Sequence, residues 1–166
     1  MGARTLILDD ARMARTVERM AWQILERHAV GERLVLAGIR NSGYALAERI
    51  QAHLAPHVSA ELIDLEVNKR EPALSDTRSS VEVASLAGAH IVVVDDVLNS
   101  GRTAFLAAAH CYHKGLKSME MAFLAVREHR SFPVYARYTG RSIATTIQEH
   151  VYFDNTNGEE LSVYLK

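Results

Sequence analysis

The sequence has a single cysteine, Cys111, and only three prolines and nine glycines in 166 residues. One cysteine forms no internal disulfide, and no group of cysteine and histidine residues has the spacing of a zinc site. We therefore expect a reducing, cytoplasmic setting, with Cys111 as an inert helical residue. The low proline and glycine content, without any low-complexity tract, excludes collagen-like and disordered chains.

An excess of charge of one sign is also lacking. The 19 Lys and Arg residues nearly balance the 20 Asp and Glu residues, so the net charge is −1. No general positive field is available for nucleic acid or anionic lipid, and any phosphate recognition must be local. The apolar runs are shorter than the ~18 residues of a membrane span, and residues 1–6 match neither a signal peptide nor a myristoylation motif. We predict no membrane partner.

Apolar residues make up 48% of the sequence, and their period switches repeatedly between that of a strand and that of a helix. This alternation predicts one α/β domain over residues 1–166. The predicted strands are 5–8, 34–39, 60–67, 91–94 and 120–125; the predicted helices run from 9 or 10 to about 28, from 43 onward, and over 103–113. Residues 68–80 show no apolar period and predict a mobile loop. The runs 134–138, 151–153 and 161–165 predict an appended small β region.

The most informative segment is residues 91–103, IVVVDDVLNSGRT. Its apolar run is typical of a parallel strand covered on both faces, and the strand delivers Asp95 and Asp96 to the edge where α/β sheets bind ligands. The turn 99–101 then opens a helix, whose first amides favour a phosphate. Acids beside a phosphate repel it unless they bind sugar hydroxyls or share a magnesium ion with the ligand. The segment therefore predicts a phosphorylated-sugar site; the alternative is an aspartate cap followed by a polar turn.

This segment closely resembles the signature of type I phosphoribosyltransferases, which bind phosphoribosyl pyrophosphate (PRPP) together with Mg²⁺. The resemblance implies that Asp95 and Asp96 are catalytic, hold the ribose hydroxyls, and reach the metal through PRPP or water. It assigns the 5′-phosphate to Asn99, Ser100, Gly101, Arg102 and Thr103. It also implies the type I fold, a mainly parallel twisted sheet flanked by helices on both faces, with a small β hood.

A second strand-to-helix turn lies at residues 38–43, GIRNSG. It is not a Walker A motif, because Tyr44 and Ala45 stand where lysine and a hydroxyl residue are required. It resembles the pyrophosphate loop of the same family. The resemblance assigns the leaving diphosphate to Arg40, Asn41, Ser42 and Gly43, with Arg40 as a catalytic cation. The alternative is an ordinary turn between a strand and a helix.

The likeness extends almost end to end to the PyrR-like group, bacterial uracil phosphoribosyltransferases of which some also bind pyrimidine-operon messenger RNA. It is carried by residues 7–9, 126–133 and 138–141. It implies a homodimer or larger oligomer, a hood over about 126–150, and a lid over about 68–84. The implied base-binding residues are Val126, Arg127, Thr139 and Gly140, and the implied lid residues are Lys69, Arg70 and Arg78.

The acceptor base and the biological role stay open. Uracil is the expected acceptor, giving UMP in pyrimidine salvage, but Ser42, Val126 and Glu128 depart from the group's usual pattern. A uridine-nucleotide-responsive RNA-binding attenuator with little turnover is the alternative class. For RNA, the first helix offers a face of Arg12, Arg15, Arg19 and Trp22. Acidic residues on the same helix favour instead a dimer contact or a solvated face.

Overall fold

The computed structural model describes residues 5–28, 31–68, 70–71, 73–113, 115–128, 130–143, 151–154 and 162–165. The elements are, in chain order, β1 (Thr5–Leu8), α1 (Asp10–Leu25), β2 (Leu34–Ile39), α2 (Ser42–Leu54), β3 (Ala60–Glu66), η1 (Leu74–Asp76), β4 (Arg78–Ser79), η2 (Val83–Leu86), β5 (His90–Leu98), α3 (Arg102–Cys111), β6 (Ser118–Arg127), β7 (Tyr138–Ile143), β8 (Val151–Asp154) and β9 (Ser162–Leu165). None of the helices in this part of the chain has both the length and the apolar character that a membrane crossing requires.

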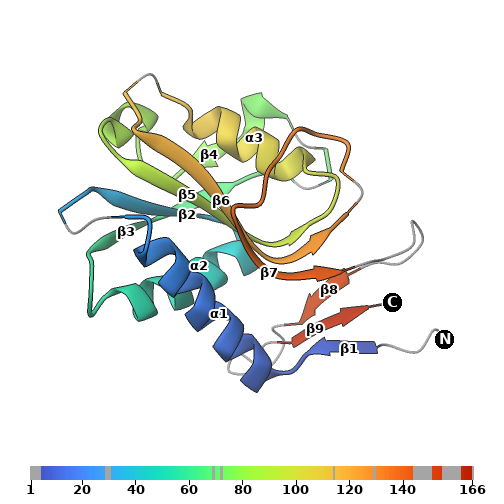
Figure 1. Cartoon of the computed structure of the whole chain (residues 1–166). Coiled ribbons are helices and arrows are strands. Elements are labelled where there is room, and N and C mark those ends of the chain that lie inside the picture. Colours follow the sequence, from blue (N-terminus) through green and yellow to red (C-terminus); the bar gives the residue numbers. More distant parts are fainter. Residues whose placement is uncertain are drawn as a thin grey trace.

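The main sheet has six strands in the order β4-β3-β2-β5-β6-β7. Strands β3, β2, β5, β6 and β7 run parallel, and the short edge strand β4 is antiparallel to β3. Helices α1 and α2 lie against one face and α3 lies against the other (Figure 1). The predicted α/β class, with a mainly parallel sheet and helices on both faces, is confirmed.

Alternate residues of β5 belong to the two faces of the sheet. Val92 and Val94 pack in the core beneath α1 and α2, whereas Ile91 and Val93 pack with the α3 side. Because both faces are covered, the strand is apolar without interruption. Cys111 of α3 is fully buried in the second layer, and this burial raises the pKa of its thiol to about 11.

The helix α1 begins as the sequence predicts. The Asp9 side chain accepts a hydrogen bond from the Arg12 amide at 2.8 Å and caps the first turn. The predicted apolar stripe of Met13, Val17, Met20 and Ile24 is buried. The helix ends at Leu25, earlier than the predicted end near His28.

Two predicted regions differ in the structure. The apolar run at 134–138 does not belong to a separate small β region; it leads into β7, which pairs in parallel with β6 and extends the main sheet. Its pattern is weak because only its two ends are buried. The separate small sheet has the order β1-β9-β8 and so includes the first strand of the chain (Figure 1). Residues 68–80, predicted as a mobile loop, contain η1 and the strand β4.

Candidate active site

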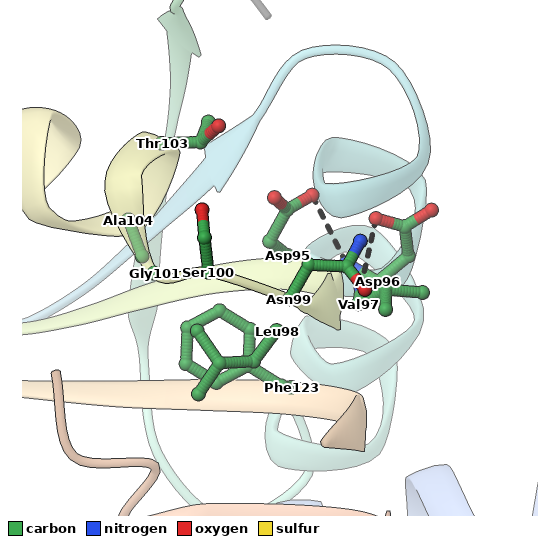
Figure 2. A pocket seen from close by; sticks show the side chains of 10 residues that line it. All are labelled: Asp95, Asp96, Val97, Leu98, Asn99, Ser100, Gly101, Thr103, Ala104 and Phe123. Carbon is green, nitrogen blue, oxygen red and sulfur yellow. Dashed lines mark hydrogen bonds between the residues drawn. The ribbon is translucent and has the colours of Figure 1, made fainter. Parts of the chain in front are cut away.

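A cavity of about 340 Å³ lies at the carboxyl end of β5. Its walls come from the end of this strand, the loop that follows it, the start of α3, and one residue of β6 (Figure 2). The lining residues are Asp95, Asp96, Val97, Leu98, Asn99, Ser100, Gly101, Thr103, Ala104 and Phe123. The structure thus brings together both predicted acids and four of the five residues predicted to hold a phosphate.

The two acids are held by backbone groups at the end of the strand. Asp95 is 3% exposed, and its Oδ1 accepts a hydrogen bond from the Asp96 amide at 3.0 Å. Asp96 Oδ1 accepts one from the Val97 amide at 2.8 Å. Figure 2 shows both carboxylates extending to the same side of the loop as the Ser100 hydroxyl. Because the backbone fixes one oxygen of each acid, both are oriented before any ligand binds.

The loop after β5 is anchored from outside the site. The Ser100 carbonyl oxygen accepts hydrogen bonds from the Ser131 amide at 2.9 Å and the Phe132 amide at 3.0 Å. Gly101 has φ +87°, and a Cβ there would come within 3.2 Å of the Val134 side chain. Glycine therefore suits this position in both conformation and space. The first amides of α3 follow directly, and they lack acceptors within the helix.

Arg102 is the predicted phosphate residue that is not among the cavity-lining residues. Its guanidinium carbon lies 5.4 Å from the centre of the Phe132 ring. The side chain therefore packs on the outer side of the loop as a cation over an aromatic face. Its amide donates a hydrogen bond to Ser100 Oγ at 3.4 Å. Arg102 therefore contacts the loop through its backbone, whereas its charged side chain contacts Phe132.

The second predicted loop meets the first through Ser42. Its hydroxyl donates a hydrogen bond to Asp96 Oδ2 at 2.8 Å. A Cβ on the next residue, Gly43, would lie 2.6 Å from the Val94 carbonyl oxygen and 2.9 Å from Asp95 Oδ1. Only a glycine allows α2 to begin this close to β5. The contacts place the start of α2 directly beside the paired acids.

Arg40 follows β2 and forms ion pairs with two acids of the neighbouring strand β3. Its guanidinium contacts Asp64 Oδ2 at 2.6 Å and Glu66 Oε2 at 2.8 Å. The hydrogen bond to Asp64, followed by the charges of both acids, raises the pKa of Arg40 further. Neither acid is among the residues predicted from the sequence. The sequence does hold a signal for them: the two acids alternate in β3, and this strand runs parallel to β2, which Arg40 follows directly.

The four predicted base-binding residues fall into two pairs. Val126 is buried near the end of β6, and Arg127 Nη1 donates to Asn99 Oδ1 at 3.3 Å, which places both beside the cavity loop. The carbonyl oxygens of Thr139 and Gly140 instead accept hydrogen bonds from Arg19 of α1, at 3.2 and 2.6 Å. The structure therefore ties these two carbonyls to α1.

The described part of the predicted lid is tied to the edge of the sheet. Arg78 lies in β4, and its Nη1 donates to the carbonyl oxygens of Ser75 and Thr77. The Arg70 amide donates to Asn68 Oδ1 at 3.0 Å, which closes a local turn. Lys69 lies outside the described residues. Arg78 thus contacts its own segment through its side chain, and Arg70 does so through its backbone amide.

The sequence matches a known protein family and several named relatives. Residues 4–154 match the model of the phosphoribosyl transferase domain. The chain is 33% identical over 149 residues to the bifunctional protein PyrR of Streptococcus thermophilus, covering 87% of this chain and 86% of that one. It is 34% identical over 173 residues to the same-named protein of Macrococcus caseolyticus, covering 98% and 99%.

The fold agrees with the same assignment. The crystal structure of the hypoxanthine phosphoribosyltransferase of Trypanosoma cruzi superposes with a TM-score of 0.75 at 15% identity, covering 96% of this chain and 95% of that one. At this identity the likeness shows the fold alone. The family match and the relatives above 30% identity carry the assignment further: the chain belongs to the phosphoribosyltransferase family and, within it, to the PyrR-like proteins.

Proposed function

We propose that this protein transfers the phosphoribosyl group of PRPP to uracil, giving UMP and pyrophosphate. The single observation that carries the proposal is the sharing of one cavity by two fixed carboxylates and a loop of amides at the start of a helix. The amides and the Ser100 and Thr103 hydroxyls suit a phosphate ester. The carboxylates suit the hydroxyls of the attached pentose.

In this proposal the protein does little covalent work. The bond between ribose C1 and the pyrophosphate oxygen breaks, and a nitrogen of the base bonds to C1. The proton of that nitrogen is released to the departing pyrophosphate or to water. Asp95 and Asp96 orient the ribose, because the backbone hydrogen bonds of the two carboxylates fix them at the cavity wall. Holding the ring in line with the base supplies the rate enhancement through orientation. The loop of Asn41, Ser42 and Gly43 lies next to these acids on the side proposed for the diphosphate.

Arg40 is proposed to stabilise the diphosphate as it leaves. Its guanidinium is about half exposed and is held at the carboxyl edge of the sheet by Asp64 and Glu66. A cation at that edge opposes the charge that develops on the leaving group. Because two carboxylates already neutralise it, the amides of its loop would supply part of the diphosphate binding.

Mg²⁺ fits the chemistry of the donor set. Asp95 and Asp96 present hard carboxylate oxygens at the cavity wall, and magnesium prefers such donors while keeping several waters. We propose that both residues hold the ion through water or through PRPP oxygens. When bound, Mg²⁺ neutralises charge on the pyrophosphate group and so favours its departure.

The choice of uracil rests on the sequence resemblance to the PyrR-like group, and the base site is proposed at Val126 and Arg127. These residues end β6 beside the cavity loop. Thr139 and Gly140 are proposed as the outer part of this site, reached from β7. Hypoxanthine, guanine, adenine, xanthine and orotate are the competing acceptors.

The deciding experiment supplies PRPP and Mg²⁺ with each of these bases in turn and measures the mononucleotide formed. We expect UMP from uracil, with pyrophosphate released only when all three components are present. Faster turnover of another base would make that base the acceptor in place of uracil, while the assignment as a phosphoribosyltransferase would stand. Absence of PRPP binding by calorimetry would overturn the site itself.

RNA-dependent regulation is a second candidate, because the matched relatives carry the word bifunctional in their name. The exposed face of Arg12, Arg15 and Trp22 on α1 is available for it. Arg19 is engaged with β7, which reduces the positive charge offered. Filter binding with the leader RNA of the protein's own operon tests this role: retention that depends on uridine nucleotide supports it, and no retention at low salt removes it.

A further inference from the structure

Two histidines and one glutamate meet at the amino-terminal edge of the sheet, the edge opposite the cavity. His28 follows α1, Glu32 precedes β2, and His90 opens β5. One nitrogen or oxygen from each residue lies within 4.8 Å of the corresponding atoms of the other two. From His90 to Asp95 the strand spans about 16 Å, so this cluster is separate from the proposed PRPP site.

Each imidazole has one nitrogen satisfied and one left over. His28 Nε2 lies 3.2 Å from Glu120 Oε2, and His90 Nδ1 lies 2.7 Å from Ser118 Oγ. The other nitrogens, His28 Nδ1 and His90 Nε2, are buried and make no hydrogen bond within the described residues. His28 is 5% exposed. Buried polar atoms of this kind ordinarily have a partner.

The hydrogen bonds already made are those that prepare histidine for a metal. A ligating imidazole usually donates its second N–H to a carboxylate or another acceptor, which fixes the ring and makes the free nitrogen more basic. Glu120 does this for His28. Glu120 is itself held by Arg27 at 2.9 Å and by the Tyr138 hydroxyl at 2.5 Å. The hydrogen-bonded support of a metal site is therefore built.

Glu32 completes the set and leaves one side open. Its Oε1 lies 3.5 Å from His90 Nε2, and its side chain is 34% exposed. The cluster is thus buried on the His28 side and reaches solvent at Glu32. This opening gives an ion access and leaves room for water as a fourth ligand, the arrangement of zinc sites with two histidines and a glutamate.

We propose that His28, Glu32 and His90 bind one divalent transition-metal ion of the zinc class. Two imidazole nitrogens favour zinc over magnesium, which takes oxygen ligands. The ion joins the end of α1, the approach to β2 and the start of β5. It therefore stabilises the fold at the edge away from the cavity, and it has no part in phosphoribosyl transfer.

The test uses the full-length chain, stripped of metal with a chelator and titrated with ZnCl₂ by calorimetry. We expect one zinc per chain and a melting temperature raised by about 5 °C or more at a hundredfold excess over the dissociation constant. His90→Asn should abolish this binding, and Glu32→Gln should weaken it at least tenfold. Both residues are partly exposed, so neither variant requires a change in the buried core.

Two further variants distinguish binding at this cluster from binding elsewhere on the surface. The double variant His53→Asn/His57→Asn removes an exposed histidine pair at the end of α2 and should leave zinc binding unchanged. Ser118→Ala removes the partner of His90 Nδ1 and should weaken binding about tenfold without removing a ligand. Zinc binding that survives both His90→Asn and Glu32→Gln, or that is lost only with His53 and His57, would overturn the proposal. So would an absence of binding to the wild-type chain.

Discussion

At the scale of single residues, the two acids of the cavity have different neighbours. Asp95 is buried and packs closely against Gly43, while Asp96 accepts a hydrogen bond from the Ser42 hydroxyl. Both acids were predictable from their position after an apolar strand. The Ser42 contact was not, because it depends on how closely α2 approaches β5, a distance set by the packing of Gly43.

Asp96→Asn should separate function from stability. The amide oxygen of asparagine still accepts the hydrogen bond from the Val97 amide. Its Nδ2 replaces the oxygen that faced Ser42 and can donate to that hydroxyl, which also accepts. The melting temperature should therefore stay within about 3 °C of wild type. The lost charge should lower kcat/KM for PRPP about a hundredfold or more. Steady-state kinetics and a thermal melt measure the two effects.

The matched control for this variant is Glu48→Gln, the same change at an exposed position of α2. It should alter neither kinetics nor melting. A large drop in the melting temperature of Asp96→Asn would show that the acid is structural, and unchanged kinetics would remove it from the site.

At the scale of helices and strands, the elements with strong apolar patterns were predictable and those held by distant partners were not. The strands at 34–39 and 60–66 follow directly from their β-branched and aliphatic residues. Strand β7 was missed because Gly140 and Arg141 interrupt its pattern, while its pairing with β6 holds it in the sheet. The ion pairs of Arg40 likewise depend on the order of β2 and β3.

The acids of β3 should compete with PRPP for Arg40. Asp64→Asn combined with Glu66→Gln removes two negative charges from the carboxyl edge and frees the guanidinium. We expect PRPP, with Mg²⁺, to bind about threefold more tightly or better. Calorimetry measures the affinity.

Glu61→Gln is the control for this pair of substitutions, since Glu61 lies on the same strand but pairs with Arg33. Its effect on PRPP affinity should be negligible. Weaker binding by the double variant would mean that the two acids position Arg40 for the ligand.

The contact between α3 and β4 should depend on pH. His110 Nε2 lies 3.1 Å from Ser79 Oγ, and burial, followed by the charge of Arg78, lowers the pKa of His110. The imidazole of His110 therefore takes up a proton at higher pH in the unfolded chain than in the folded one. The contribution of His110 to stability is complete above about pH 6.5 and is lost on acidification.

Thermal melts from pH 7.5 to about 5.5, with a chelator present, test this dependence. His110→Gln keeps a hydrogen-bonding side chain and should reduce the loss of stability over this interval, whereas the exposed His53→Asn should not. Identical slopes for wild type and His110→Gln would contradict the prediction.

At the scale of the whole molecule, both helical layers depend on the same sheet. The buried side of α1 packs in one core with residues of β2, β5 and β6, and α3 packs against the opposite face of β2 and β5. This arrangement is the α/β class that the sequence predicts. The histidine and glutamate cluster was beyond sequence reasoning, because its members come from three segments that only the parallel order of β2 and β5 brings together.

Unfolding should therefore be a single transition. Trp22, the one tryptophan of the chain, is 47% exposed and lies against His57, with ring centres 4.8 Å apart. Its fluorescence reports on α1 and α2, whereas far-UV circular dichroism reports on all elements. In guanidinium chloride both signals should have the same midpoint. An earlier midpoint for fluorescence would show that α1 separates from the sheet before the rest unfolds.

The alternation of β5 limits how this strand can change. Val92 and Val94 face one helical layer and Ile91 and Val93 the other, and the same alternation carries Asp96 toward Ser42. Exchanging one aliphatic side chain for another leaves that order intact. Inserting or deleting a single residue between 91 and 94 would turn the last acid away from its hydroxyl partner and expose apolar side chains to the wrong layer. The length of this segment, more than its composition, is therefore what its evolution and its redesign must preserve.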